Sequence, residues 1–232
     1  MGFDDLSQLI RTAIVDNAND SIYQLNEQQN RRLEKRMGTT VVMSLIIDDK
    51  MYISHIGDSR IYLITKTEIQ QITQDHNVAM KNYRDGYSSL EDSIKTSLTQ
   101  WGKVLTQALG PREGNTLEVD TNFINIKEDC YVLLCSDGLT DMVKDEDILK
   151  IVNDNWQNPD LVTSSLVDQA NENGGRDNIT VVSVNVKLMP KLFPHYDYAD
   201  IFYERETEFS NEMIELVDTN EKSLDAINVL PE

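Results

Sequence analysis

The sequence predicts an α+β fold in which antiparallel strands pack against helices. Three observations support this fold class: a helical apolar pattern over residues 5–30, closely spaced β-rich runs over residues 39–65, and further helical patterns over residues 145–172. With 232 residues and 40% hydrophobic content, the chain can form one sizeable domain with a real core, or such a domain with an appendage.

The first segment, residues 5–30, is predicted to form one long helix. Its apolar residues recur at steps of one, three and four, which places them on a single helix face. They are Leu6, Leu9, Ile10, Ala13, Ile14, Ala18, Ile22 and Leu25. We expect this stripe to pack against the core and assign it no cofactor role.

Strands are predicted next, because three runs are rich in β-branched and aromatic residues. They are TTVVMSLII (39–47), MYISHI (51–56) and RIYLIT (60–65). The turns between them are too short to hold crossover helices, so consecutive strands should pair as antiparallel hairpins. Residues 75–103 are polar and lack a sheet pattern, and we expect a helical or mobile excursion there.

The second half of the chain continues the strands and adds two helices. Strands are expected near 117–126, 130–135 and 179–186, and helices near 145–156 and 160–172. The last helix precedes Gly174 and Gly175, as expected of a helix C-terminus.

The character of the chain changes at Pro190. The 43 residues from there to the end hold 11 acidic residues against 3 basic ones, and three of the five prolines. Such a composition predicts an acidic appendage outside the packed domain. The expected organisation is a domain over residues 1–188 and an acidic C-terminal extension over residues 189–232.

The net charge of −19 excludes several classes of partner. A chain this acidic is repelled by phosphate backbones and anionic lipid headgroups, so we expect no nucleic-acid partner and no membrane partner. The N-terminus has no apolar signal core, and no run approaches the length of a membrane span. Cys130 and Cys135 should face opposite sides of one strand and stay reduced, which predicts a cytoplasmic protein.

A possible site begins where the strand 130–135 ends in Ser136-Asp137-Gly138. Asp and Gly are common turn residues, so a simple turn explains this junction. The alternative, which this stretch alone favours less, is a carboxylate held on a rigid element to bind a metal. The residues of this stretch alone leave both interpretations open.

Two further acids favour the metal interpretation. Asp177 directly precedes the strand 179–186, so it would lie beside Asp137 if the two strands are antiparallel neighbours. Asp58 follows the strand 51–56 at a Gly bend and could reach the same edge. Three clustered carboxylates repel one another unless a cation lies between them. Mg²⁺ or Mn²⁺ suits such oxygen ligands best.

Other kinds of site receive less support. The acidic run DMVKDED (141–147) lacks the pattern of a calcium loop and is better explained as the start of a helix. Three histidines without paired spacing argue against a zinc site. No Gly-x-Ser-x-Gly elbow occurs and neither cysteine has a histidine partner, which argues against covalent catalysis.

Six segments in order resemble the metal-dependent type-2C serine/threonine protein phosphatases, the PPM family. They are GTT (38–40), HIGDSRIYL (55–63), ITQDH (72–76), LTQALG (105–110), LLCSDGLTDMV (133–143) and GGRDNITVV (174–182). The resemblance covers about residues 38–186. It implies a sandwich of two antiparallel sheets flanked by helices, with a two-metal centre of Mg²⁺ or Mn²⁺ at one end.

The resemblance also implies an activity and roles for single residues. A metal-activated water would attack the phosphorus of a phosphoserine or phosphothreonine protein, with no phosphoenzyme. Asp137 and Asp177 match metal ligands of the binuclear centre, and Asp58 matches a ligand of a looser third metal. The remaining matches support the site, and they are Gly138, Asn178 and Thr39. Residues 77–103 match the variable flap beside the active site.

The sequence departs from the family pattern at its N-terminal side. The family has an early Arg followed by Asn-Glu-Asp, and a strand ending in Asp-Gly-Met-Gly-Gly or Asp-Gly-His-Gly-Gly, and this chain has neither. These motifs supply the phosphate-binding Arg, the Asp that bridges the metals, a Gly carbonyl ligand and core strands.

Three hypotheses follow from this departure. The chain is a phosphatase polypeptide that lacks its first segment and is weakly active or inactive, a non-catalytic PPM-like binding or regulatory module, or an enzyme with a one-metal site. Missing strands also predict an incomplete sandwich with open sheet edges and self-association.

Overall fold

The computed structural model describes residues 9–188. Residues 1–8 and 189–232 lie outside the described part, and they include the predicted acidic extension and the start of the predicted first helix. The predicted domain boundary after residue 188 therefore stays a prediction. Among the described residues, no helix combines the length and the apolar character that crossing a membrane requires.

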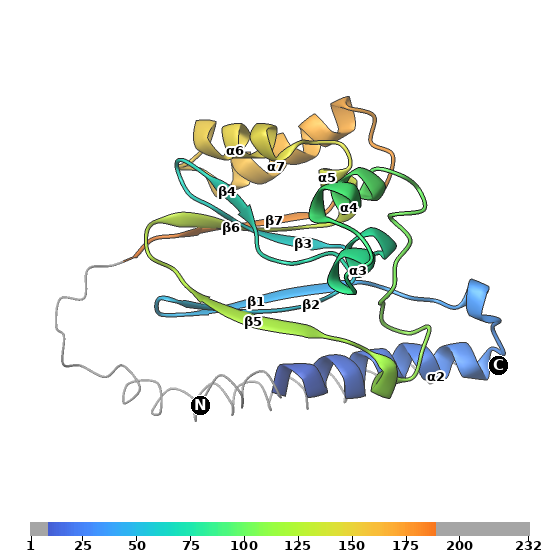
Figure 1. The fold of residues 1–232 in the computed structure, drawn as a ribbon. Helices are drawn as coiled ribbons and strands as arrows, with labels where there is room; N and C mark the ends of the chain where they lie inside the picture. Colours follow the sequence, from blue (N-terminus) through green and yellow to red (C-terminus); the bar gives the residue numbers. More distant parts are fainter. Residues whose placement is uncertain (1–8, 189–232) are drawn as a thin grey trace, which may run out of the picture. The chain divides into compact units, whose positions relative to one another are not determined.

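Two antiparallel sheets form the centre of the fold, with helices on both outer faces (Figure 1). The strands are β1 (Val41–Ile47), β2 (Lys50–Ile56), β3 (Arg60–Ile64), β4 (Ile69–Gln71), β5 (Asp120–Asn125), β6 (Cys130–Cys135) and β7 (Val181–Val186). The α-helices are α2 (Asp20–Gln28), α3 (Val78–Arg84), α4 (Leu90–Ser97), α5 (Asp137–Thr140), α6 (Asp145–Asp154) and α7 (Pro159–Glu172). Shorter or irregular helical segments are η1 (Ala13–Asn19), η2 (Leu33–Lys35) and η3 (Gly114–Thr116). The predicted α+β fold with two antiparallel sheets is confirmed.

The strand order is β1-β2-β5 in one sheet and β4-β3-β6-β7 in the other. The β1–β2 hairpin is confirmed, with Val41 opposite Ile56. The expectation that every consecutive run forms a hairpin is wrong at the next step, because β2 and β3 lie in different sheets. Gly57, with φ of 106°, begins the short connection that carries the chain across. Connection length alone cannot distinguish a hairpin from such a crossing.

The core has layers on both sides of β6. Cys130 and Val132 pack between the two sheets, whereas Leu133 and Cys135 pack toward the outer side, in a cluster with residues of α6 and α7 such as Leu166. Because successive strand residues alternate between faces, a spacing of five puts the two cysteines on opposite sides, as predicted. Both are buried and free.

The N-terminal helix covers the outer face of the three-stranded sheet (Figure 1). Helical structure extends from residue 9 to Gln28, as predicted, but the predicted stripe is only partly buried. Leu9 and Leu25 are 57% and 46% exposed, while Asn19 and Asn26 are fully buried. The segment η1 is π-helical, and its wider turn rotates the following residues relative to a regular α-helical stripe.

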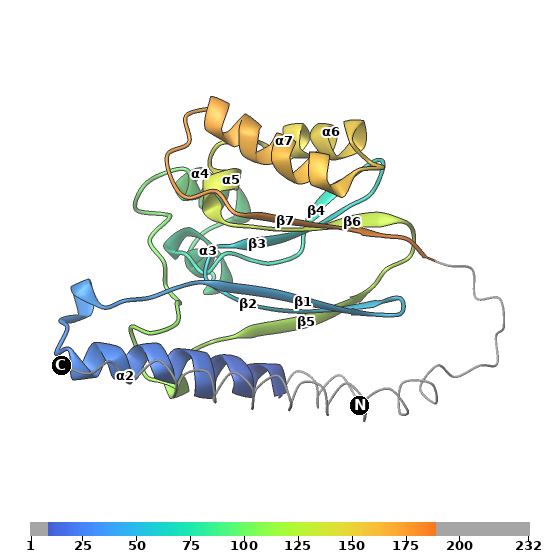
Figure 2. The same ribbon diagram turned by 180° about the vertical axis from the view of Figure 1, so that it is seen from behind.

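The edge strand β7 leaves apolar surface uncovered. Val182 and Val184 share a strand face with Val186, which packs between the sheets. They are nevertheless 52% and 42% exposed. Within residues 9–188, no strand pairs with the free edge of β7. Figure 2 shows this strand from the opposite side to Figure 1. Among the described residues, therefore, nothing pairs with this edge of the sheet.

We expect the purified chain to self-associate through this edge, because an unpaired strand beside exposed valines favours pairing with a second chain. Val182→Lys should weaken self-association by at least about tenfold, or about 1.4 kcal/mol. Leu161→Lys is the matched control, since Leu161 is 49% exposed on α7. Sedimentation velocity over a concentration series measures the effect. A wild-type chain that stays monomeric throughout the series contradicts the expectation.

Candidate functional site

The three predicted acids lie around one cavity at one end of the four-stranded sheet. In that sheet Arg60 pairs with Cys135, and Cys135 pairs with Val181. Asp58 lies two residues before Arg60, Asp137 lies two residues after Cys135, and Asp177 lies four residues before Val181. All three acids are therefore at the same end of the sheet. The cavity that they line has a volume of about 760 Å³. Register thus brings together carboxylates from three distant segments.

Burial and neighbouring carboxylates raise the pKa of two of these acids. Burial, followed by the negative charge of Asp137, raises the pKa of Asp58 to about 6. Burial and then the charge of Asp177 raise the pKa of Asp137 as well. Neither acid forms an ion pair within the described part of the chain. The site therefore concentrates negative charge that no ion pair within residues 9–188 neutralises.

Asp58→Asn is expected to stabilise the metal-free protein at pH 7.5. A carboxyl group whose pKa is raised from 3.8 to about 6 by folding opposes folding once it ionises. This penalty is absent below about pH 4 and complete above about pH 7. Since one pKa unit equals about 1.4 kcal/mol and partial exposure reduces the effect, we expect a gain of about 1–2 kcal/mol. Urea unfolding at pH 4 and pH 7.5 measures it, and an equal effect at both values contradicts the repulsion.

Ser136 joins the segments that carry Asp137 and Asp177. Its hydroxyl donates to the Asn178 carbonyl at 2.9 Å and accepts from the Thr180 N–H at 3.0 Å. Gly138 allows this close approach, because a Cβ atom there would lie 2.4 Å from the Asn178 carbonyl oxygen. Sequence reasoning missed Ser136, although its place beside Asp137 was a usable signal.

The other predicted supporting residue, Thr39, lines the same cavity. Its backbone forms an isolated antiparallel bridge with Leu109, with N–H to carbonyl distances of 3.1 and 2.9 Å. This bridge holds the segment before β1 against the segment before Gly110. Thr39 therefore forms one wall of the cavity.

A second cavity of about 920 Å³ shares Asp58 and Asp137 with the first. The helices α3 and α4 supply its apolar lining, and the predicted excursion over residues 75–103 is thus largely helical. Several large apolar side chains of this region face solvent, led by Tyr87, Leu98 and Trp101 at 82%, 79% and 67% exposure. The flap region, polar in overall composition, therefore presents exposed apolar side chains next to the acidic site.

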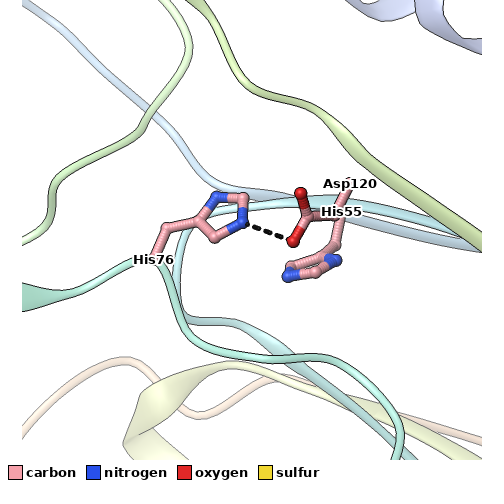
Figure 3. Close-up of side chains that lie close together, drawn as sticks. All are labelled: His55, His76 and Asp120. Atoms are coloured by element: carbon pink, nitrogen blue, oxygen red, sulfur yellow. Dashed lines mark hydrogen bonds and ion pairs between the residues drawn. The ribbon is translucent and has the colours of Figure 1, made fainter. Parts of the chain in front are cut away.

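A further cluster consists of His55, His76 and Asp120 (Figure 3), whose possible ligand atoms lie within 4.8 Å of one another. Among residues 9–188 it is the one group of three such side chains that close together. Sequence reasoning did not bring these three residues together, because they are far apart in the chain. Strand register pairs His55 with Asp120, and the connection after β4 adds His76.

The hydrogen bonds of this cluster disfavour a metal. The Gly57 N–H donates to His76 Nδ1 at 3.2 Å, so Nδ1 has no proton and Nε2 carries it. Nε2 lies 3.1 Å from the Asp120 carboxylate. A metal on Nε2 would move the proton to Nδ1, where it would face the Gly57 N–H. We therefore interpret the cluster as a hydrogen-bonded network, although its composition suits a metal.

Comparisons with known proteins all indicate the same protein family. The family model described as "Protein phosphatase 2C" matches residues 2–82 and 118–179. Over 158 residues the chain is 38% identical to "Serine/threonine phosphatase stp" of Listeria welshimeri, covering 67% of this chain and 59% of that protein. It is 34% identical over 168 residues to "Protein phosphatase PhpP" of Streptococcus pneumoniae, covering 72% and 65%.

Solved structures give the same result. A serine/threonine phosphatase of S. agalactiae matches with a TM-score of 0.70 and 28% identity, over 80% of this chain and 73% of that one. PstP/Ppp of Mycobacterium tuberculosis matches with a TM-score of 0.61 and 30% identity, over 73% and 68%. The chain belongs to the protein phosphatase 2C family, which confirms the predicted resemblance. It spans about three fifths of the length of the Listeria relative.

Proposed function

We propose that this chain is a metal-dependent protein serine/threonine phosphatase whose Asp58, Asp137 and Asp177 hold Mg²⁺ or Mn²⁺. The convergence of three acids from three segments on one cavity carries the proposal. Relatives named serine/threonine phosphatase support the reaction. Reduced, buried cysteines are consistent with a cytoplasmic location.

The donor set fits a hard divalent cation. The acids that line the 760 Å³ cavity, among the described residues, offer carboxylate oxygens, which Mg²⁺ and Mn²⁺ prefer. Burial and then the charge of a neighbouring carboxylate raise the pKa of Asp58 and of Asp137, and a positive ion would offset that repulsion. When bound, such a cation would supply an activated water for attack on phosphorus.

The surrounding residues provide a place for a phosphorylated segment. Asp58 and Asp137 line both cavities, so a phosphorylated side chain that reaches the acids has the apolar side chains of the flap region beside it. Lys103 is paired with Asp141 at 2.5 Å, but Arg112 and Arg176 form no ion pair with any described residue. These two guanidinium groups would offset the charge of the substrate phosphate.

Turnover should be slow. Within the described residues, the three acids offer few shared ligands for two cations, so we expect weak metal binding. The same observation favours a second candidate function, a PPM-like module that binds phosphoproteins without hydrolysing them. The two functions differ only in whether phosphate is released.

Phosphate release from a phosphoserine peptide, in millimolar Mn²⁺, tests the proposal. We expect slow release above the protein-free background that a chelator abolishes. Release that equals the background at every protein concentration overturns the enzyme. If the peptide still binds in that case, with its affinity measured by fluorescence anisotropy, the non-catalytic module replaces it.

A further inference from the structure

Gly57, the residue directly before Asp58, is held from both sides by one histidine. Its N–H donates to His76 Nδ1 at 3.2 Å, and its carbonyl accepts from the His76 backbone N–H at 2.9 Å. The His76 side chain is completely buried, so no water competes for these bonds. The two residues therefore form a closed clamp on the backbone that leads into the acidic site.

The clamped turn has a conformation that would not persist by itself. Gly57 has a φ of 106°, and a Cβ atom there would lie 2.3 Å from Thr40 Cγ2. A flexible glycine leaves many backbone states open. Within residues 9–188, the two bonds to His76 are the hydrogen bonds that fix both peptide groups of Gly57.

Asp120 fixes the ring that closes the clamp. Because Nδ1 accepts from Gly57, the proton lies on Nε2, which donates to Asp120 Oδ2 at 3.1 Å. The Asp120 pKa is lowered, first by this hydrogen bond, so the carboxylate is ionised and a strong acceptor. The His55 ring lies 4.7 Å from the His76 ring and has its own partner, the Gln74 carbonyl, at 2.9 Å.

We propose that His76 is a positioning residue that holds Asp58 at the acidic cavity by clamping Gly57, with Asp120 selecting the required ring tautomer. The inference rests on the proposed function, because it concerns how Asp58 is presented to the cation. Residues that orient metal ligands typically change metal affinity by about 10–100-fold. We expect a loss in that range when the clamp is removed.

Four variants separate the parts of the clamp. His76→Ala removes the ring, whereas His76→Asn keeps an acceptor oxygen near the position of Nδ1 and loses only the contact to Asp120. Asp120→Asn keeps an acceptor for the Nε2 proton, and Asp120→Ala removes it. Isothermal titration of the full chain with Mn²⁺ measures the affinity, and ¹⁵N NMR of the histidine rings reports the tautomer.

We expect His76→Ala to weaken Mn²⁺ binding by about 10–100-fold, with His76→Asn and Asp120→Asn recovering most of the affinity. Hydrogen exchange of the Gly57 amide should accelerate in His76→Ala and stay slow in His76→Asn. If His76→Ala does not fold, the comparison of Asp120→Ala with Asp120→Asn decides, since only the first removes the acceptor.

Three results would overturn the inference. They are unchanged Mn²⁺ affinity in folded His76→Ala or in Asp120→Ala, a proton on Nδ1 of His76, and tight Zn²⁺ binding that is lost in His76→Ala. A wild-type chain that binds no Mn²⁺ overturns the metal centre of the proposed function together with this inference. If the wild-type chain binds Mn²⁺, but no more tightly than His76→Ala does, this inference alone is overturned.

Discussion

Asp137→Asn is expected to lower both Mn²⁺ affinity and phosphate release by at least about tenfold. Substituting a residue that only orients a metal ligand already lowers metal affinity or activity by about 10–100-fold. Asp137 is electrostatically coupled to both other acids of the site, because burial and then the charge of Asp177 raise its pKa. It also raises the pKa of Asp58. Asparagine keeps the shape and one oxygen but removes the charge that attracts the cation.

The same substitution should stabilise the metal-free protein at neutral pH, because it removes a source of repulsion. Lower metal affinity together with higher stability is specific to a repulsive ligand cluster. Asp154→Asn is the matched control, since Asp154 is exposed at the end of α6 and should change neither quantity. Mn²⁺ titration and urea unfolding measure both. Wild-type Mn²⁺ affinity in Asp137→Asn would exclude Asp137 as a ligand.

The sequence predicts those parts of the site that depend on where strands end. Asp137 and Asp177 each border a strand with a clear β-rich pattern, and antiparallel pairing of those two strands is enough to bring them together. Gly138 and Asn178 lie next to these acids in the chain and could be inferred with them. Local pattern and one pairing thus account for the side of the cavity formed by Asp137 and Asp177.

Parts that depend on how the two sheets stack could not be predicted. The change of sheet at Gly57 uses a connection as short as a hairpin turn, so spacing does not reveal it. The network of His55, His76 and Asp120 requires both that change of sheet and the register of β2 with β5. The periodicity of apolar residues in the sequence indicates neither the change of sheet nor this register.

The N-terminal helix shows a different limit. Its apolar stripe predicted which residues should be buried, yet Asn19 and Asn26 are the fully buried ones. Asn19 accepts from the Gly110 N–H at 2.7 Å, and Asn26 donates to the Gly110 carbonyl at 3.0 Å. Buried amides are stable only when such bonds are made, and a distant loop supplies these bonds. Hydrophobic periodicity contains no information about that loop.

Asp75→Ala is expected to destabilise the protein by about 3 kcal/mol, near the lower end of the range for breaking a buried ion pair. Asp75 is 6% exposed and accepts two hydrogen bonds from Arg60, at 2.9 and 2.8 Å. Gln71 and Asn77 donate to the same carboxylate at 3.1 and 3.3 Å. Removing it leaves four N–H groups of three side chains, one of them charged, without this acceptor.

The pKa of Arg60 shows how strongly the pair is coupled. Burial alone would lower this pKa, but the hydrogen bonds and charge of Asp75 raise it above its usual value. The guanidinium therefore stays charged after the substitution, with only a quarter of its side chain exposed to water. The resulting cost is the desolvation of an unpaired cation rather than the loss of an attraction.

A double substitution separates the desolvation cost of the unpaired cation from the loss of attraction between the two charges. If an unpaired buried charge causes the loss, Arg60→Met combined with Asp75→Leu should cost clearly less than Asp75→Ala alone, because apolar replacement of both partners is often nearly neutral. Asp85→Ala is the control, since its pair with Lys81 at 2.9 Å is exposed and should contribute little to stability. Urea unfolding at one protein concentration gives all four free energies. A double variant that is less stable than Asp75→Ala would show that the pair stabilises the fold through its attraction.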